Sequence, residues 1–371
     1  MSRYRFALAT PEDDVALRAR MAQDRMEGAI SVSFRREPSY FAGCCVQGDE
    51  TQVVKCVDTQ TGTLVGLGSL STAPAYVDGA ARAIGYLSDL RVAPEYRRGT
   101  LLARGYRYFR QLHDGNGAHA VPFYTTMIYE GNAPALAALT GARAGLPRYR
   151  DWGRFITPAL NLDFGVKPAP VPGVTIARGS SARLAEIVAF LNRWQSHKQF
   201  APVYRATDFP QGRFRGLRAE DFYLAMRHER IVGTIAVWDQ AAFRQTHVER
   251  YSPGLALLRP ACNALARVLP VRPLPAPGAR IPGVYLACLA TEEDDVNVFR
   301  HLLRATHEAI RRGPWHFAIA GLHEKDPRAA ALLQMRHIPA AGRLFAVHFA
   351  DQPLSMESPA QRVPYVEAGC L

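Results

Sequence analysis

The chain has 371 residues, of which 48% are hydrophobic, so it is long enough to bury two typical domain cores. It has no apolar run long enough to cross a bilayer and no secretory signal over residues 1–20, so we expect a cytoplasmic protein with no membrane partner. The formal net charge of +12 suits an anionic ligand, but the sequence lacks a basic stripe with interleaved aromatic residues, so we expect no nucleic-acid partner.

In chain order, the first predicted element is a strand at residues 5–9. A helix follows, whose start is marked by Thr10 as the cap, Pro11 in the first turn and Asp13 as the acid three residues on. A hairpin over residues 53–70 turns at Thr61 and Gly62. A strand at 86–92 then leads into an amphipathic helix, and a strand at 123–128 leads into a helix that begins at residue 133.

A proline-rich segment at 167–173, KPAPVPG, interrupts both the helical and the strand periodicity and is typical of an extended linker. It divides the chain into a domain at 1–166, a linker at 167–173 and a second domain at 174–371. A second proline-rich stretch, 270–283, lies between apolar segments of the same half and predicts a long internal loop.

The second half repeats the element order of the first. A strand at 174–177 precedes a helix that starts near Ser180 and Ser181, a hairpin follows at 222–238, and a strand at 284–290 precedes an amphipathic helix at 296–310. The strand at 317–320 also leads into an alanine-rich helix. Its residues match those of the first half at identical spacing, with Asn132, Ala135 and Leu139 corresponding to Asp326, Ala329 and Leu333.

The six cysteines show neither Cys-x-x-Cys spacing nor the rhythm of a disulfide framework, and the eleven histidines are scattered. We therefore expect reduced, mostly buried thiols and no bound metal.

Residues 86–109, YLSDLRVAPEYRRGTLLARGYRYF, resemble the coenzyme-A-binding motif of GNAT N-acetyltransferases, through Leu90, Val92, Pro94 and Arg97. The resemblance implies an α+β fold, an α/β three-layer arrangement of two GNAT-like domains with mixed, mostly antiparallel sheets. It also implies that acetyl-CoA or another acyl-CoA is the co-substrate, with a small molecule or another amine as the acceptor.

In such a site, loop amides at the positive end of a helix dipole bind the pyrophosphate, and amides freed by a strand bulge bind the pantetheine arm. Thr100 and Leu102 stand where the family has small residues, so either the loop is reshaped or Arg97 and Arg98 contact the phosphates directly. Asn132 either touches the pantetheine or caps the following helix. The implied ligand-binding residues are Leu90, Arg91, Val92, Arg97, Arg98, Gly99, Thr100, Leu101, Leu102 and Asn132.

Asp89 is the candidate general base, because an amine must lose a proton to attack a thioester; the alternative is that Asp89 pairs with one of the many arginines. In the family, a tyrosine on the helix after the asparagine protonates the departing thiolate, but the matching residue here is Leu139. Tyr124 and Tyr129 are therefore the candidate general acids, the alternative being that both pack in the structure and solvent protonates the thiolate.

The acceptor pocket implied by the resemblance lies near residues 33–43. Adjacent arginines there favour a carboxylate or phosphate on the acceptor, although a solvated loop explains them equally well. The candidate lining residues are Arg35, Arg36, Tyr40 and Phe41.

The second repeat has four acids, Glu292 to Asp295, where a pyrophosphate would sit, so we expect it not to bind coenzyme A. The acids predict a well-capped helix start, with a cation-binding wall as the alternative. The predicted function is transfer of an acyl group from acyl-CoA to an amine. The alternatives are a non-catalytic acyl-CoA sensor or scaffold, and an aminoacyl-tRNA-dependent transferase.

Overall fold

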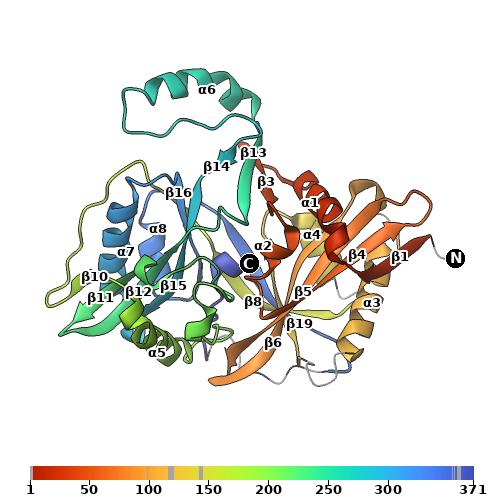
Figure 1. Ribbon diagram of the computed structural model, residues 1–371, viewed down its shortest axis with the longest axis horizontal. Helices are drawn as coiled ribbons and strands as arrows, with labels where there is room; N and C mark the ends of the chain where they lie inside the picture. The colour runs from red at the N-terminus through yellow and green to blue at the C-terminus, as the bar shows by residue number, and fades with distance from the viewer. Residues whose placement is uncertain are drawn as a thin grey trace.

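Two mixed sheets form the body of the protein, one for each half of the chain (Figure 1). The computed structural model describes residues 3–97, 99–115, 121–141, 145–352, 354, 356 and 361–371. All strand pairs are antiparallel except β6 with β7 and β15 with β16, which are parallel. The prediction of an α+β fold with mixed, mostly antiparallel sheets is therefore confirmed.

The first half follows the predicted order. Its hairpin turns at Gly62, where the positive φ of 72° favours glycine. Its elements are β1 (Tyr4–Leu8), α1 (Asp14–Gln23), β2 (Arg25–Met26), β3 (Ile30–Arg35), α2 (Tyr40–Cys44), β4 (Glu50–Asp58), β5 (Leu64–Val77), β6 (Ala80–Val92), α3 (Leu101–Gly115), β7 (Tyr124–Tyr129), α4 (Ala133–Thr140), β8 (Arg148–Ile156) and β9 (Ala159–Asn161).

The second half repeats this order and adds a helix that the sequence analysis did not predict, α6. Its elements are β10 (Thr175–Arg178), α5 (Leu184–Gln195), β11 (Phe222–Arg227), β12 (Arg230–Trp238), β13 (Gln245–Tyr251), α6 (Pro253–Leu265), β14 (Arg280–Ile281), β15 (Gly283–Thr291), α7 (Val296–Ile310), β16 (Phe317–Ala320), β17 (Leu322–His323), α8 (Ala329–Leu333), β18 (His337–Ile338) and β19 (Ala341–His348).

The amphipathic helices pack where their periodicity predicts. Tyr106 and Phe109 of α3 are buried in a cluster that also contains Tyr124 and Phe345, and Leu102 packs against it. The apolar face of α7 is buried in a cluster with strands of the second sheet. The apolar faces of α3 and α7 therefore pack each helix against the sheet of its own half.

The two halves exchange strands. The first sheet has the order β1-β4-β5-β6-β7-β19-β8-β17, so β19 from the end of the chain lies between β7 and β8. The second sheet has the order β10-β11-β12-β15-β16-β9-β18, so β9, which precedes the linker, pairs with β16. The division at 167–173 did not anticipate this exchange, because each sheet contains strands from both sides of the linker.

A third, small sheet, β14-β13-β3-β2, joins the halves through the antiparallel pairing of β13 with β3. It carries α6, which stands away from the body (Figure 1), and the loop at 266–279. Arg272 of that loop contacts the body, where it donates to the Asp163 carboxylate and to the carbonyls of Arg311 and Gly313. Along the described part of the chain, none of the helices combines the length and apolarity needed to span a bilayer.

Candidate active site

A bulge in β6 lies at the centre of the predicted site. Leu67 pairs with Arg91 and Ser69 with Ser88, so two residues of β6, Asp89 and Leu90, lie opposite one residue of β5. Asp89 has a φ of 54°, in the left-handed region, as expected for a residue that reverses the strand's local direction. No side chain among the described residues accepts a hydrogen bond from the amide of Asp89 or of Leu90.

Beside the bulge, β6 separates from β7. The two strands pair in parallel only at Gly85 with Tyr124 and at Tyr86 with Thr125. Gly85 permits this close approach, because a Cβ at that position would lie 2.0 Å from Cδ1 of Tyr124. The Thr126 hydroxyl donates to the Leu87 carbonyl at 2.8 Å, and the ladder ends there, one residue before Ser88 and two before the bulge. The opening between the strands therefore lies next to the bulge amides.

The Asp89 carboxylate forms an ion pair with the Arg36 guanidinium and accepts a hydrogen bond from the Tyr40 hydroxyl at 3.0 Å. The Tyr40 hydroxyl also lies 3.0 Å from the Ser69 hydroxyl. Only 8% of the Asp89 side chain and 4% of the Arg36 side chain are exposed. The structure thus brings together the predicted base and two of the predicted acceptor-site residues.

The two tyrosines beside this pair are held neutral. Burial raises the pKa of Tyr40, and the charge of Asp89 raises it further. The same two causes, in the same order, raise the pKa of Tyr86. Burial, the largest single influence, lowers the pKa of Arg36, but Asp89, Tyr40, Cys44 and Tyr86 together raise it by more, so the net pKa lies above the ordinary value. The site therefore contains a charged pair surrounded by neutral hydroxyl groups.

The other half of the chain also contributes to the site. The Arg244 guanidinium, which lies just before β13, donates to the carbonyls of Gly43 and Leu371 at 2.9 Å and of Gly369 at 3.2 Å. The Gln47 amide, oriented so that its oxygen faces these cations, accepts from Arg36 and Arg244 at 3.2 Å. The sequence analysis missed both Gln47 and Arg244. Arg244 could not be linked to the site, because about two hundred positions separate it from Arg36.

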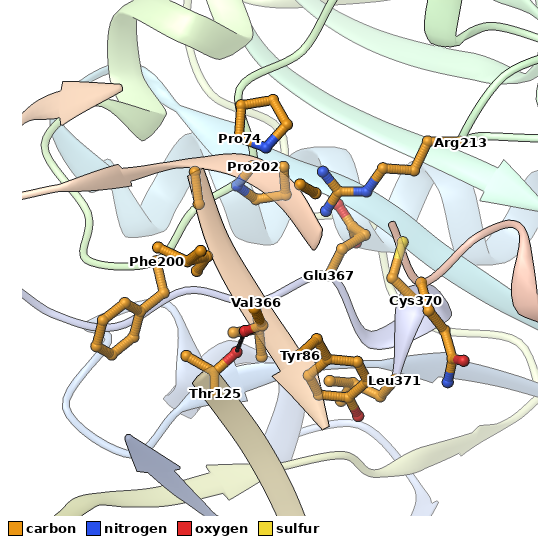
Figure 2. Close-up of a pocket in the computed structure, with 15 residues that line it drawn as sticks. Pro74, Tyr86, Thr125, Phe200, Pro202, Arg213, Val366, Glu367, Cys370 and Leu371 are labelled. Atoms are coloured by element: carbon orange, nitrogen blue, oxygen red, sulfur yellow. Dashed lines mark hydrogen bonds between the residues drawn. The ribbon is translucent and has the colours of Figure 1, made fainter. Parts of the chain in front are cut away.

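A cavity of about 50 Å³ lies at the junction of the two halves (Figure 2). Its walls come from β5, from β6 with Tyr86, from the segment around Phe200 and from the end of the chain, including Glu367 and Leu371. Tyr86 and Gln47 line this cavity and also lie near the Asp89 cluster, so the cavity and the cluster are neighbours.

In the predicted phosphate-binding loop, Arg97 contacts groups of the protein itself. Arg97 donates through Nε to the Val92 carbonyl at 2.9 Å and through Nη2 to Asp24 at 3.3 Å, while Arg91 lies 3.7 Å from Asp24. Gly99 has a φ of 124°, which suits glycine, and α3 begins two residues later. Arg98 lies outside the described residues.

The side chains of the following residues face the core. Leu101 is buried with Cys56 and Val65, and Leu102, in the first turn of α3, packs against the cluster that contains Tyr106 and Phe109. A ligand at this helix start would therefore meet the backbone of residues 99–102 rather than these side chains.

Several other predicted residues are not brought to the Asp89 cluster. Arg35 pairs with Glu249 at 2.9 Å on β13, and Phe41 packs edge-on against Tyr40. Tyr124 is buried beneath α3 with its hydroxyl 3.1 Å from Nδ1 of His113, and Tyr129 is 40% exposed at the end of β7. Asn132 caps α4 by accepting the Ala135 amide at 3.2 Å, as one of its two predicted roles requires.

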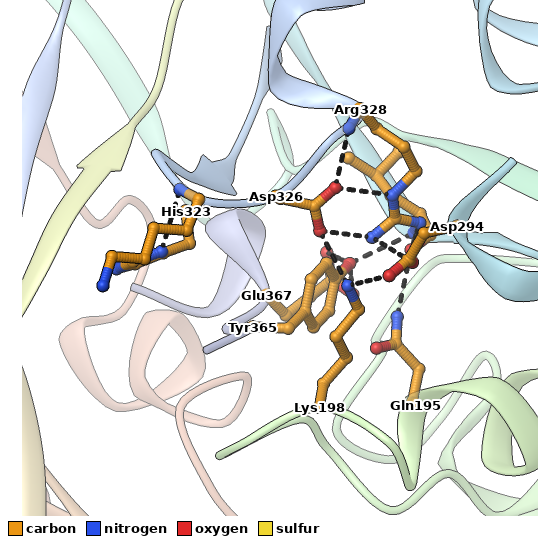
Figure 3. Close-up of polar contacts among 10 residues, drawn as sticks. Gln195, Lys198, Asp294, His323, Asp326, Arg328, Tyr365 and Glu367 are labelled. Atoms are coloured by element: carbon orange, nitrogen blue, oxygen red, sulfur yellow. Dashed lines mark hydrogen bonds and ion pairs between the residues drawn. The ribbon is translucent and has the colours of Figure 1, made fainter. Parts of the chain in front are cut away.

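The second repeat contains the same bulge, but its amides are occupied by Glu367 and Tyr365, two residues that Figure 3 labels. Thr234 pairs with Ala290 and Ala236 with Ala287, so Cys288, with a φ of 53°, corresponds to Asp89. The Cys288 amide donates to the Glu367 carboxylate at 3.0 Å. The Leu289 amide donates to the Tyr365 hydroxyl at 3.1 Å. In the second repeat, residues 365–367 therefore fill a position that no described side chain fills in the first.

The acids at the start of α7 are paired or serve as caps. Asp295 caps the helix by accepting the amides of Asn297 and Val298, as predicted for a well-capped start. Asp294 pairs with Lys198 at 2.5 Å and with Arg328 at 3.4 Å. In the described ranges, no group of three or more His, Cys, Asp or Glu side chains is placed to hold a metal ion.

The cysteines are free, as predicted. Cys44, Cys56, Cys288 and Cys370 are buried, and Cys45 and Cys262 are exposed. Burial raises the pKa of Cys44 to about 11, so this thiol beside Arg36 is protonated at neutral pH.

Comparison with known proteins identifies the fold. No family model matches the sequence, and no curated protein matches it. Among solved structures, the glucosamine N-acetyltransferase region of a fungal multi-domain β-N-acetylglucosaminidase matches with a TM-score of 0.60 at 11% identity, over 93% of this chain and 38% of that one. The chain thus spans well under half the length of that protein.

Two further structures match over most of both chains. Saccharomyces cerevisiae N-myristoyltransferase with bound myristoyl-CoA has a TM-score of 0.60 at 9% identity, covering 94% of this chain and 83% of that one. A GCN5-related N-acetyltransferase from Sphaerobacter thermophilus has a TM-score of 0.56 at 13% identity, covering 93% and 96%. The chain therefore has the tandem GNAT fold that N-acetyltransferases and N-myristoyltransferase share.

Proposed function

We propose that the protein is an acyltransferase, which binds acyl-CoA at the bulge of the first repeat and transfers the acyl group to an amine. The observation that carries the proposal is the difference between the two bulges. The amides of Cys288 and Leu289 are hydrogen-bonded to Glu367 and Tyr365, whereas those of Asp89 and Leu90 meet no side-chain acceptor in the described structure. Bulge amides that no side chain occupies, beside separating strands, can bind a thioester and its pantetheine arm.

In the proposed reaction, an amide of the bulge donates a hydrogen bond to the thioester carbonyl and stabilises the oxyanion that forms when the amine attacks. The new C–N bond forms, and the C–S bond then breaks. The amine proton passes to the Asp89 carboxylate, directly or through a water molecule, and the thiolate takes a proton from solvent. Solvent fits this role better than Tyr124, whose hydroxyl is engaged with His113 in the core.

Arg36 has a positioning role in this scheme. Its ion pair holds and orients the Asp89 carboxylate, and an acceptor that carries its own anionic group would compete for Arg36 and release Asp89. This favours an amine acceptor that also bears a carboxylate or a phosphate. The myristoyl-CoA named for the yeast structure is the donor of that enzyme. Which acyl chain this protein transfers is left to the test below.

A second candidate function is a non-catalytic acyl-CoA sensor. The closed pair of Asp89 with Arg36 favours it, because a base that stays paired would not accept the amine proton. Both the acyltransferase and the sensor would bind acyl-CoA, but only the acyltransferase would turn it over.

The test measures the thermal midpoint of the full chain with saturating acetyl-CoA and with myristoyl-CoA, followed by thiol release with a panel of amines. Ligand binding to the native state raises the midpoint. Arg97→Glu places a negative charge at the exposed loop and should abolish the rise, whereas the control Arg107→Glu, at an exposed position of α3, should keep it.

Asp89→Asn should keep the rise in midpoint and lower thiol release by about 10²- to 10⁴-fold. Asp114→Asn is its control, at an exposed carboxylate. A rise without thiol release for any amine would support the sensor. No rise with either acyl-CoA would contradict both functions and would leave the tRNA-dependent alternative to be tested by RNA binding.

A further inference from the structure

The helix α6 carries its apolar residues on the side that faces away from the protein. No residue of α6 is buried. Leu257 is 83% exposed and Leu258 58%, and Leu265 is 51% exposed. Just beyond the helix, Val268 is 78% exposed. Positions 257, 261, 265 and 268 follow the spacing of one helical face, so these side chains form one continuous stripe.

The polar side of the same helix faces inward. Arg259 donates to the carbonyls of Leu274 and Pro275, at 3.2 and 3.1 Å. Asn263 donates to the Leu274 carbonyl at 3.1 Å and accepts the Leu274 amide at 2.7 Å. The loop at 266–279 is thus hydrogen-bonded to the polar face of α6. A helix packed on a core buries its apolar face, whereas α6 leaves its apolar face exposed.

The arm formed by α6 and its loop is firmly rooted. It leaves the body through β13, which pairs with β3 and β14, and the Tyr251 hydroxyl donates to the Pro275 carbonyl at 2.6 Å. Figure 1 shows α6 as the outermost element of the molecule on that side. The apolar stripe is therefore held in a fixed position where a flat surface can reach it without meeting the body.

The charge of the arm has one sign. The sequence contains no Asp or Glu between Glu249 and Glu292, whereas it contains five arginines in that interval. Of these, Arg250, Arg267 and Arg280 are exposed. Arg250 pairs with Glu27 and Arg272 with Asp163, both outside the interval. An apolar stripe accompanied by arginines and by no acid complements a surface that has an apolar interior and anionic groups at its edge.

We propose that the arm docks on an anionic membrane surface. Leu257, Leu265 and Val268 enter the boundary between headgroups and acyl chains, and Arg267 and Arg280 contact lipid phosphates. A second copy of the chain fits less well. A symmetric dimer through this stripe would place the same arginines against one another without an acid to neutralise them. The inference does not depend on the proposed acyl transfer.

The test is sedimentation of the full chain with vesicles of phosphatidylcholine alone and of phosphatidylcholine with about one-third phosphatidylserine. We expect binding to the mixed vesicles, weaker binding to phosphatidylcholine alone, and loss of binding as the salt concentration rises. The variant Leu257→Glu, Val268→Glu should reduce vesicle binding at least about tenfold, because both side chains would place a charge at the lipid boundary.

Leu333→Glu is the matched control, since Leu333 is an exposed leucine on α8, outside the arm. It should bind vesicles like the parent chain. Because all three positions are exposed, the thermal midpoints of the variants should match that of the parent, which separates lost docking from lost folding. Arg267→Glu with Arg280→Glu should abolish the preference for phosphatidylserine.

Two outcomes would overturn the proposal. One is equal sedimentation of the parent chain with and without either vesicle. The other is a concentration-dependent dimer that Leu257→Glu, Val268→Glu dissociates, with no vesicle binding, which would assign the stripe to a second copy instead.

Discussion

The carboxylate of Glu367 accepts the amide of Cys288 at 3.0 Å, at the residue that corresponds to Asp89 in the other repeat. Glu367 also accepts the hydroxyls of Tyr204 and Tyr365, both at 3.1 Å, and is only 3% exposed. A protein group thus occupies the hydrogen-bonding position of one bulge, while no side chain among the described residues accepts from the equivalent amides of the other, which is the proposed acyl-CoA site.

Glu367→Ala should destabilise the protein strongly. It leaves three buried donors without an acceptor, at a cost of about 1–3 kcal/mol each before any relaxation. Urea unfolding should therefore show a loss of about 3 kcal/mol or more. The control Glu186→Gln changes an exposed carboxylate and should leave the unfolding midpoint unchanged.

Glu367→Gln should change the pH dependence of stability. Burial raises the pKa of Glu367, and the hydrogen bonds that it accepts offset only part of this increase. Between the ordinary glutamate pKa of about 4.3 and the higher folded value, the folded state binds more protons than the unfolded state, so the free energy of unfolding contributed by this group falls as the pH rises. The variant lacks this titration. Its stability relative to the parent should therefore improve as the pH rises through that window, and a constant difference would contradict this account.

Arg36→Met should cost about 3–5 kcal/mol of stability, because it leaves the Asp89 carboxylate buried without its partner. Adding Asp89→Asn should restore most of the loss, since the uncompensated charge is removed. Arg35→Met provides the neighbouring control. The pair of Arg35 with Glu249 is more exposed, and its loss should cost about 0–1 kcal/mol. If the double variant were as unstable as Arg36→Met alone, the packing of Arg36 rather than its charge would be the cause.

Residues 1–173 should not fold on their own. In the whole chain, β7 and β8 both pair with β19, and a fragment that ends at 173 leaves both edges without that partner. We expect poor dispersion of the amide proton chemical shifts for this fragment, and a well-dispersed spectrum when residues 174–371 are co-expressed with it. A dispersed spectrum of the fragment alone would show that β19 is dispensable for the first sheet.

The sequence predicted what local patterns encode. The two repeats, the strand that carries Asp89 and the cap provided by Asn132 all depend on residues that are close together in the chain. The amphipathic spacing of α3 and α7 likewise identified their buried faces. The duplicated order was therefore visible without the structure.

Long-range placement was not predictable in the same way. The insertion of β19 between β7 and β8 and the approach of Arg244 to Arg36 depend on partners far apart in sequence. Tyr124 was a candidate acid because its strand was identified, but the side of the strand on which it lies is fixed by packing against Phe109. The helix α6 was missed because its prolines, including the internal Pro260, are typical of loops.

The pairing of β13 with β3 has a consequence for selectivity. Gln245 lies opposite Arg35, and its side chain accepts the Glu37 amide at 3.0 Å and donates to the Glu37 carbonyl at 2.8 Å, so the second repeat clamps the backbone on both sides of Arg36. If the first repeat transfers acyl groups as proposed, the second repeat, whose own bulge is filled, sets the shape of the proposed acceptor wall. Substitutions at Gln245 would then change which acceptor is used without altering Asp89 or the bulge of β6.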